Sequence, residues 1–478
     1  MNRCTEVDGI CEALEIPGAA IEPRGRQVVK IEPAAVPFDR KGRVVLVTAL
    51  TPTPAGEGKT TTAVGLVDGL SRIGVRAIGA LREPSLGPLM GLKGGAIGGG
   101  AARLVPAEQI NLHFTGDLHA VTSAHNLLSA MLDNHLHFGG SPSLEPAAIT
   151  WGRVLDMNDR ALRRITLRGS KKAVREDRFD ITAASEVMAV LCMASDPADL
   201  VARLGRIVVG LDVEGRPVTA RDLGADGAMA ALLVDAMRPN LVRTLEDNPV
   251  LVHGGPFANI AQGTSTLIGT RLARRLADVV ITEAGFAFDL GGFKFLDLKC
   301  RAGGFLPADI VLVVTVRALR HHGGVDHAAG PDAAAVERGL ENVAAHLDAI
   351  ERLGLPAPLL AVNLFGDEAD DELKVVTRFA DARGTQAVPC DGFARGGAGA
   401  EALAAALMGR LEGRPAESTW RAAYDLKASL PVKIEGVART VFGATGVELT
   451  ERAQADLALI ERMNLGDLPV CLAKTHLS

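Results

Sequence analysis

Short apolar runs rich in Val, Ile and Leu recur along the chain and are separated by polar or glycine-containing segments. We expect these runs to form strands, and they cover residues 43–50, 75–81, 206–211, 249–254, 278–285, 309–316, 356–365 and 385–390. Most are apolar throughout instead of alternating, which is typical of strands buried on both faces of a parallel sheet. Between them lie helix-like segments such as residues 264–277 and 336–354.

This alternation of strands and helices predicts an α/β fold, with a doubly wound, mostly parallel sheet and a second, smaller α/β domain. The chain has 478 residues, which is too long for one ordinary core. We place the domain boundary near residue 350, with a larger domain at 1–350 and a smaller one at 351–478. In such folds ligands bind beyond the carboxyl ends of the strands, and polar or glycine-rich clusters follow several predicted strands here.

One of these clusters, "TPTPAGEGKT" at residues 51–60, connects a predicted strand to a helix-like segment. Backbone N–H groups of residues 56–58 can surround phosphate oxygens at the helix N-terminus, Lys59 would reach the terminal phosphates, and the Thr60 hydroxyl suits Mg²⁺. The usual P-loop spacing has glycine where this chain has Thr53, and a Thr-Pro-rich approach can set the loop path instead. The alternative is an ordinary glycine turn with a solvated lysine. The fold is therefore predicted to contain a P-loop.

A second cluster, "REPSLGP", places Arg82 and Glu83 directly after the strand predicted at 75–81. Arginine offers a planar fork that suits a carboxylate, a phosphate or an acyl phosphate. The alternative is a long surface loop with an ion-paired arginine. We favour a functional role because the cluster follows a strand beside the phosphate loop.

Residues 111–137 hold five of the eleven histidines. Their spacing lacks the pairs and cysteine neighbours of a zinc site. Asp117, His119 and His125 are the better candidates for orienting a ligand or transferring a proton. The remaining histidines of the segment are more simply explained as helix-start and helix-contact residues.

Two further clusters follow predicted strands. Glu283 and Asp289 lie at a strand end and in a glycine-rich loop, where an acidic group would hold Mg²⁺ or orient substrate, or would only cap the following element. Residues 256–266 form a ligand loop or a helix start capped by Thr264 or Ser265.

Phe365 and Phe393 also fall just after predicted strands in a chain with only 4% aromatic residues. Two rings facing each other across a cleft would stack a flat heteroaromatic ligand. Core packing is the alternative for each ring taken alone.

Composition narrows the class of protein. The net charge is −6 with no basic block, which argues against a nucleic-acid surface. No apolar run reaches the roughly 18 residues of a membrane span, and the first residues lack a signal-peptide pattern. The six cysteines are scattered without a C-x-x-C pair, so we expect neither a zinc site nor a disulfide framework. We expect a cytoplasmic enzyme without membrane or nucleic-acid partners.

From about residue 37 to its end the chain resembles the formate–tetrahydrofolate ligase family. The resemblance rests on "TPTPAGEGKTTT", "REPSLGP", "INLHFTGDLHAVTSAHNLL", "GGPFANIA", "ITEAGF" and "VRALRHHGGV" in this order. It implies that the protein makes 10-formyltetrahydrofolate from formate, ATP and tetrahydrofolate through formyl phosphate, and releases ADP and phosphate. It also implies Mg²⁺, a monovalent cation (K⁺ or NH₄⁺) and a homotetramer.

The resemblance, for the 53–60 loop, Arg82, Phe365 and Phe393, and the motifs above, for the other candidates, together assign residues to roles. Arg82 would hold formyl phosphate, Phe365 and Phe393 would enclose the pterin ring, and Thr60 and Glu283 are the metal candidates. Domain 1–350 would bind nucleotide and formyl phosphate, and domain 351–478 would contribute the folate-side aromatic residues. The ATP loop would comprise Thr53, Pro54, Ala55, Gly56, Glu57, Gly58, Lys59 and Thr60. The catalytic candidates are Lys59, Arg82, Glu83, Asp117, His119 and His125.

Three departures from the family pattern keep two other functions open. The chain ends where family members continue with a further segment. Residues 285–295 read "GFAFDLGGFKF", with Phe293 in place of an acid, and Gln262 and Phe393 replace an expected histidine and indole. The alternatives are a paralogue that releases formate from 10-formyltetrahydrofolate and a non-catalytic nucleotide-binding regulatory subunit.

Overall fold

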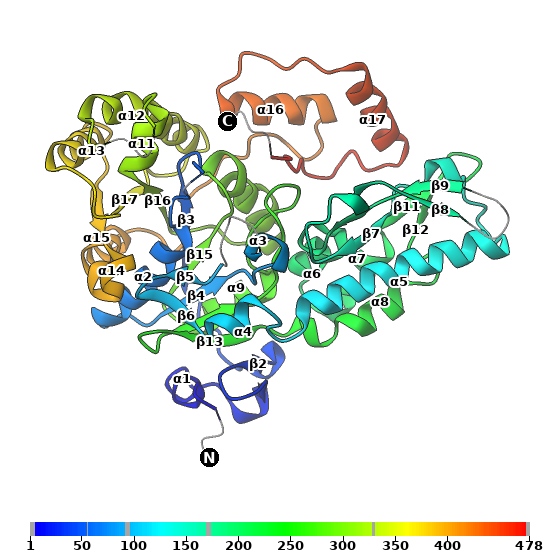
Figure 1. The fold of residues 1–478 in the computed structure, drawn as a ribbon, viewed down its shortest axis with the longest axis horizontal. Coiled ribbons are helices and arrows are strands. Elements are labelled where there is room, and N and C mark those ends of the chain that lie inside the picture. Colours follow the sequence, from blue (N-terminus) through cyan, green and yellow to red (C-terminus); the bar gives the residue numbers. More distant parts are fainter. Residues whose placement is uncertain (1–4, 55, 91–95, 169–173, 327–329, 475–478) are drawn as a thin grey trace.

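The computed structural model describes residues 5–54, 56–90, 96–168, 174–326 and 330–474. A 12-stranded sheet runs through the main body, with helices on both of its faces (Figure 1). Along its main path the strands follow the order β1 (Ile21–Pro23), β2 (Val29–Ile31), β13 (Asn240–Thr244), β14 (Pro249–Val252), β4 (Ala77–Leu81), β15 (Val279–Glu283), β3 (Arg43–Ala49), β16 (Asp309–Val314), β17 (Leu359–Asn363) and β18 (Ala387–Cys390).

All pairings from β14 to β18 are parallel, whereas β1, β2 and β13 join antiparallel at the other edge. The short strands β5 (Gly98–Gly99) and β6 (Ala102–Val105) extend the sheet through β13. The predicted α/β fold with a mostly parallel sheet is confirmed.

The strands of the main sheet are apolar at consecutive positions because each face of the sheet packs against a separate hydrophobic core. In β3, Val44 and Leu46 belong to one core, while Val45 and Val47 belong to the other. The helices α9 (Leu267–Leu276), α11 (Val316–His322), α12 (Ala333–Arg352) and α13 (Asp370–Ala382) pack in the first core, and α2 (Lys59–Arg72) and α15 (Glu401–Leu411) pack in the second. Strands covered on both faces need apolar residues at every position.

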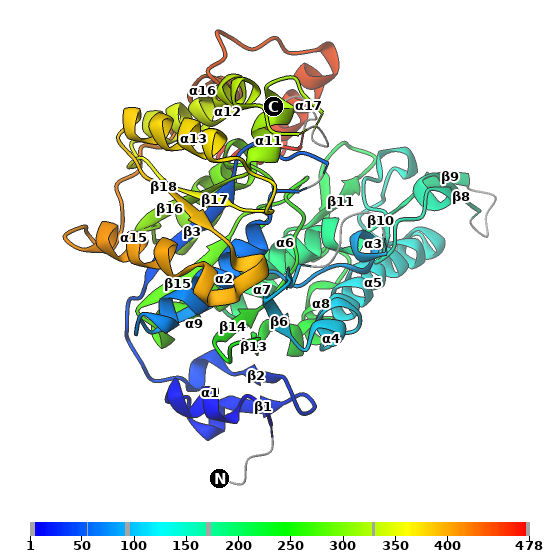
Figure 2. The same cartoon turned by 60° about the vertical axis from the view of Figure 1, so that its left-hand side comes forward.

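Residues 117–168 and 174–237 form a lobe with a core of its own, which lies beside the sheet in Figures 1 and 2. Its helices are α5 (Asp117–Phe138), α6 (Glu186–Met193), α7 (Pro197–Gly205) and α8 (Asp226–Leu233). Three two-stranded sheets accompany them, made of β7 (Arg153–Leu155) with β10 (Phe179–Ile181), β8 (Ile165–Arg168) with β9 (Val174–Asp177), and β11 (Val208–Leu211) with β12 (Pro217–Thr219).

The strand predicted at 206–211 exists as β11, but its expected place in the parallel sheet is wrong. It pairs antiparallel with β12 in the lobe. Its apolar residues Ile207 and Val209 are buried in the lobe core, and burial there produces the same apolar run as burial in the main sheet.

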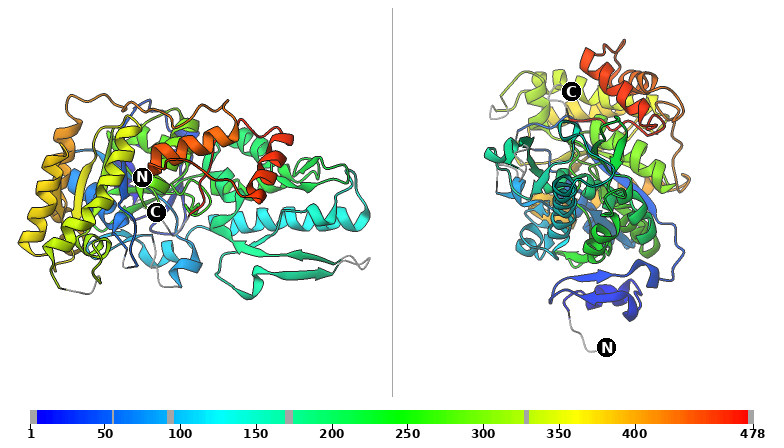
Figure 3. Two further views of the ribbon diagram at one scale, coloured as in Figure 1. Left: turned by 90° about the horizontal axis from the view of Figure 1, so that it is seen from above. Right: turned by 90° about the vertical axis from the view of Figure 1, so that its right-hand side faces the viewer.

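The remaining helices are short or peripheral. They are α1 (Asp8–Ala13), α3 (Leu86–Leu89), α4 (Ala107–Asn111), α10 (Arg301–Gly303), α14 (Gly392–Arg395), α16 (Leu430–Phe442) and α17 (Glu451–Arg462). Residues 288–292 and 295–300 form two π-helical segments. The C-terminal helices α16 and α17 lie on the opposite side of the molecule from the N-terminal segment (Figure 3). None of the described helices is long and apolar enough to cross a membrane.

The predicted domain boundary near residue 350 falls between β16 and β17, which pair with each other in the main sheet. The division into domains 1–350 and 351–478 stays a prediction.

Candidate functional site

The loops at the carboxyl ends of β3, β4, β15, β16 and β17 share one edge of the parallel sheet. The chain passes from β3 to β4 in one direction along the sheet, and later from β15 across β3 to β16 in the opposite direction, so that the direction of the connections reverses at β3. Such a point is where doubly wound sheets bind their ligands. The candidate site is therefore the edge formed by these loops.

The loop predicted to bind phosphate, called the phosphate loop below, connects β3 to α2. Gly56 and Gly58 have φ angles of 77° and 71°, which a residue with a side chain adopts only with strain. Gly56 is exposed, and a Cβ atom there would meet nothing within 4 Å. Lys59 is the first residue of α2, a 14-residue helix whose N-terminal N–H groups favour anions. Of the loop residues predicted to bind ATP, Ala55 lies outside the described residues.

Three residues from separate parts of the sequence meet beside this loop. The Thr60 hydroxyl donates a hydrogen bond to Glu283 Oε2 at 2.8 Å, and an Arg82 nitrogen lies 3.4 Å from Glu283 Oε1. Glu283 is buried and ends β15, and Arg82 directly follows β4. A hydroxyl and a carboxylate oxygen at this spacing form a donor set that fits Mg²⁺, whose remaining ligands are usually water and phosphate oxygens.

No cluster of three or more His, Cys, Asp or Glu residues suited to a metal ion occurs within the described ranges. A divalent ion at Thr60 and Glu283 would therefore depend on ligands supplied by the nucleotide. That dependence is typical of Mg²⁺ in nucleotide sites.

Glycines of neighbouring loops let the backbone approach Arg82 and Glu83. The N–H of Glu83 donates to the carbonyl of Gly254 at 2.9 Å, and a Cβ on Gly255 would lie 2.3 Å from the carbonyl oxygen of Glu83. A Cβ on Gly285 would lie 3.1 Å from Arg82 Nη1. The loops after β4, β14 and β15 thus pack closely around the guanidinium.

Glu83, which the sequence predicts as a catalytic candidate, is buried at this edge of the sheet. Burial, with the charge of Asp117 as the second cause, raises the pKa of Glu83 well above its ordinary range. Its Oε2 atom is buried and makes no hydrogen bond within the described structure. A raised pKa keeps this carboxyl protonated to a higher pH than an exposed glutamic acid, and a protonated carboxyl can donate a proton.

Asp117 and His125 have structural partners. Lys30 donates to both Asp117 oxygens at 2.9 and 3.0 Å, and all these polar atoms are buried. His125 stacks on Trp151 at 4.0 Å between ring centres and contacts Ser185 Oγ at 2.8 Å. Burial lowers the pKa of His125 to about 4. These contacts hold the start of the lobe and its core, and the predicted ligand roles of both residues stay predictions.

His119 is exposed on α5, and its Nε2 lies 3.5 Å from Ser123 Oγ. The structure records no contact of His119 with Thr60, Arg82 or Glu283 among the described residues. Its predicted role in orienting a ligand also stays a prediction.

Phe365 and Phe393 are 41% and 57% exposed. The Arg317 guanidinium lies over the Phe365 ring at 4.4 Å, and a Cβ on Gly99 would lie 3.1 Å from the Phe393 ring. Neither ring is packed in a core, so the core alternative is wrong for both. No contact between the two rings is recorded among the described residues, and their pairing around a ligand stays a prediction.

The altered segment at 285–295 corrects one expectation. Asp289 lies in a π-helical turn instead of a glycine-rich loop, and burial raises its pKa to about 6. Phe288 and Phe293 are fully buried members of the core on the α9 side. Their rings fill core space, so an acidic side chain at position 293 would lie in an apolar environment.

The helix predicted to be capped by Thr264 or Ser265 is capped one residue beyond Ser265 instead. Thr266 is the N-cap of α9, and its hydroxyl accepts a hydrogen bond from the Gly269 N–H at 2.8 Å.

Sequence reasoning missed three residues that contact the predicted site. Lys30 pairs with Asp117, Thr315 donates to the Glu57 carboxylate at 2.8 Å, and Asn363 donates to the Glu57 carbonyl at 3.3 Å. Thr315 and Asn363 lie near the carboxyl ends of the strands predicted at 309–316 and 356–365, and that position was the available signal. Lys30 carries no such signal.

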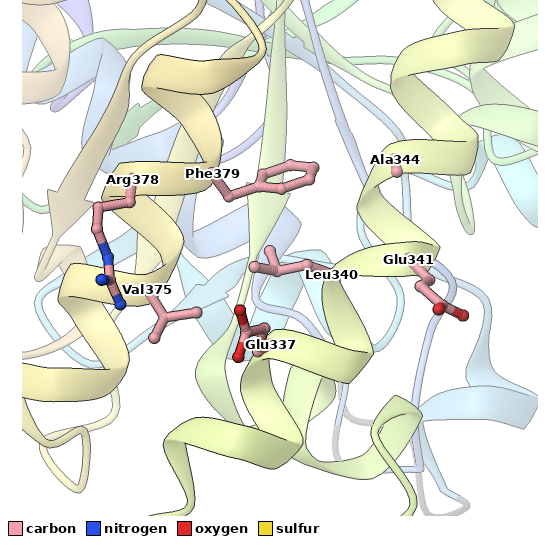
Figure 4. A pocket seen from close by; sticks show the side chains of 7 residues that line it. All are labelled: Glu337, Leu340, Glu341, Ala344, Val375, Arg378 and Phe379. Atoms are coloured by element: carbon pink, nitrogen blue, oxygen red, sulfur yellow. The ribbon is translucent and has the colours of Figure 1, made fainter.

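A cavity of about 440 Å³ lies elsewhere, between α12 and α13. Figure 4 shows Leu340, Val375 and Phe379 projecting into the space between the helices, with Glu337 and Arg378 at its rim. None of the residues predicted from sequence to bind a ligand lines it.

Comparisons with known proteins bear on this geometry. A family model described as formate–tetrahydrofolate ligase matches residues 1–478. The chain is 51% identical over 483 residues to the formate–tetrahydrofolate ligase of Methylobacterium sp. (strain 4-46), covering 99% of this chain and 86% of that protein. Identity to the same-named protein of Myxococcus xanthus (strain DK1622) is 52% over 445 residues, or 92% and 81% of the two chains. For Symbiobacterium thermophilum it is 50% over 485 residues, or 100% and 86%.

Proposed function

The chain belongs to the formate–tetrahydrofolate ligase family, and from this premise we propose how the edge at β3, β4 and β15 performs the reaction. The reaction is the ATP-dependent ligation of formate to tetrahydrofolate. The observation that carries the residue assignments is the meeting of Thr60, Arg82 and Glu283 beside the phosphate loop.

ATP would bind with its phosphates on the N–H groups of the loop and of the first turn of α2. Lys59 would approach the terminal phosphates. Thr60 and Glu283 would hold Mg²⁺, which neutralises charge on the β- and γ-phosphate oxygens when bound. Phosphoryl transfer depends mainly on positioning and charge neutralisation, and these residues supply both.

Formate would bind beside Arg82. A formate oxygen attacks the γ-phosphorus, the bond between that phosphorus and the ADP oxygen breaks, and formyl phosphate forms. The N10 nitrogen of tetrahydrofolate then attacks the formyl carbon, the bond between that carbon and the phosphate oxygen breaks, phosphate leaves, and N10 loses its proton to water. Arg82 suits the acyl phosphate because its fork donates to two oxygens at once.

We assign proton transfer to Glu83, because its pKa is raised and its buried Oε2 atom makes no hydrogen bond among the described residues. A protonated Glu83 can donate to the departing phosphate.

The exposed rings of Phe365 and Phe393 would bind the pterin of tetrahydrofolate. We include a monovalent cation, K⁺ or NH₄⁺, and a homotetramer in the proposal on the family resemblance. The cytoplasmic location expected from the scattered cysteines stays a prediction.

The test is a reaction containing ATP, Mg²⁺, K⁺, formate and tetrahydrofolate, followed by acid and measurement of the methenyl derivative of any 10-formyl product. We expect absorbance only when all three substrates are present. Lys59→Ala should abolish it, whereas Lys374→Ala, an exposed lysine on α13, should not.

Product from a folded Lys59→Ala variant at the wild-type rate would refute the site assignment. Formate release from 10-formyltetrahydrofolate without ATP would instead support the hydrolytic alternative. Nucleotide binding without turnover would support the regulatory one.

A further inference from the structure

The carboxylate of Glu57 lies inside the phosphate loop and faces the protein. Its Oε1 atom accepts hydrogen bonds from the N–H and the hydroxyl of Thr53, at 2.8 and 2.9 Å. Its Oε2 atom accepts from the Thr315 hydroxyl at 2.8 Å. The residue is only 2% exposed, so this carboxylate is fully engaged within the protein.

These bonds connect the loop to two neighbouring strands. Thr315 follows β16 and caps α11 by accepting from the Ala318 N–H at 3.1 Å. Asn363, the last residue of β17, donates to the backbone carbonyl of Glu57 at 3.3 Å. A Cβ on Gly58 would lie 2.4 Å from Asn363 Nδ2, so the loop is pressed against this strand end.

Thr53, which donates two of these hydrogen bonds, stands where a usual P-loop has a glycine. In the usual P-loop pattern this position is the first glycine, whose freedom sets the turn. Thr53 lacks that freedom but supplies two hydrogen-bond donors, and both reach the same Glu57 oxygen. Hydrogen bonds to an ionised carboxylate are roughly twice as strong as neutral ones.

We propose that Glu57 is a positioning residue for ATP. Its side chain holds the loop between Thr53 and the Thr315 hydroxyl so that the N–H groups of residues 56–58 face the phosphates. It does this without contacting ATP, because a free carboxylate there would repel the phosphates. The proposal rests on the proposed function for the identity of the nucleotide, but not on turnover.

The test removes the Thr315 hydroxyl and then restores it. Thr315→Val deletes the donor at nearly constant shape, and Thr315→Ser keeps it. MgADP affinity is measured by calorimetry, and the KM for each substrate by steady-state kinetics. We expect Thr315→Val to weaken MgADP binding and raise the KM for ATP about ten- to hundredfold, as loss of a charged hydrogen bond implies. The KM for formate should not change, and Thr315→Ser should restore wild-type values.

A double-mutant cycle identifies Glu57 as the partner. In a Glu57→Ala background, Thr315→Val should have no further effect on MgADP affinity. Circular dichroism melting confirms that each variant is folded. Wild-type MgADP affinity in a folded Thr315→Val protein would overturn the proposal, as would an undiminished effect in the Glu57→Ala background.

Different measurements decide the proposed function and the role of Glu57. Because MgADP affinity needs no turnover, an inactive wild-type protein would refute the proposed function while the affinity series still decides the role of Glu57.

Discussion

Replacing Lys30 by methionine should strongly destabilise the protein, because the change leaves a buried carboxylate without its cation. Lys30 is 0% exposed and Asp117 is 3% exposed. The ammonium donates to both Asp117 oxygens and to the carbonyl of Arg238 at 3.1 Å. After the substitution, Asn240, at 2.9 Å from Asp117 Oδ2, is the remaining donor that the structure records for this carboxylate.

Breaking a buried ion pair by removing one partner costs about 3–5 kcal/mol. A urea dependence of roughly 2 kcal/mol per molar converts this cost into a midpoint shift of about 1.5–2.5 M. The shift is followed by tryptophan fluorescence, because Trp151 is buried in the lobe whose first helix begins at Asp117.

The double variant Lys30→Met/Asp117→Leu should recover most of the lost stability, because it leaves no unpaired charge. Equal midpoints for wild type and Lys30→Met would refute the reasoning. The double variant also separates the two roles of Asp117: a stable but inactive protein would support the catalytic role, and retained activity would show that the residue is structural.

Acidification, loss of an aromatic ring and an added methyl group test other parts of the molecule. Burial lowers the pKa of His125 to about 4, against about 6.5 in the unfolded chain. The neutral imidazole therefore contributes its full stability above about pH 6.5, and this contribution is lost as the pH falls toward 4. His125→Gln should make the urea midpoint fall less steeply between these pH values, and an unchanged slope would contradict this. Phe365→Leu should raise the KM for tetrahydrofolate about tenfold and leave that for ATP unchanged, and equal KM values for tetrahydrofolate would count against the stacking role. Gly58→Ala should lower MgADP affinity at least about tenfold, because the added Cβ would clash with Asn363. Gly74→Ala is the matched control, because Gly74 has a φ of 84° and a Cβ there would meet nothing within 4 Å. Equal MgADP affinities of the two variants would contradict the clash.

The parts of the site that are continuous in sequence were predictable. The β3–loop–α2 unit appears in order as an apolar run, two glycines, Lys59 and Thr60, followed by a helix. Each step has a local physical cause, because strand burial, left-handed glycine conformations and the helix N-terminus depend on neighbours in the chain.

The convergence of Thr60, Arg82 and Glu283 was not predictable from their positions alone. Each was predicted as a separate candidate, but their contact depends on β15 lying between β4 and β3. Strand order is set by packing over the whole sheet. The Lys30–Asp117 pair is similar, because its partners are 87 residues apart and Lys30 lies in the short strand β2, which carries no motif.

The errors also have physical causes. Residues 206–211 are apolar because they are buried, and burial in the lobe cannot be told from burial in the main sheet. Asp289 was expected in a loop because Gly291 and Gly292 follow it. A Cβ on Gly291 would lie 1.8 Å from the Gly285 carbonyl, so this glycine permits a close approach inside a helical turn.

The central claim is that formate accepts the γ-phosphate of ATP at the edge formed by β3, β4 and β15. The most direct test supplies formate labelled with ¹⁸O and measures the released phosphate by mass spectrometry. Because the oxygen that attacks phosphorus leaves with phosphate when N10 takes the formyl group, the account predicts one ¹⁸O atom in each phosphate released, and no labelled phosphate from Arg82→Ala. Unlabelled phosphate accompanying 10-formyltetrahydrofolate formation would contradict it.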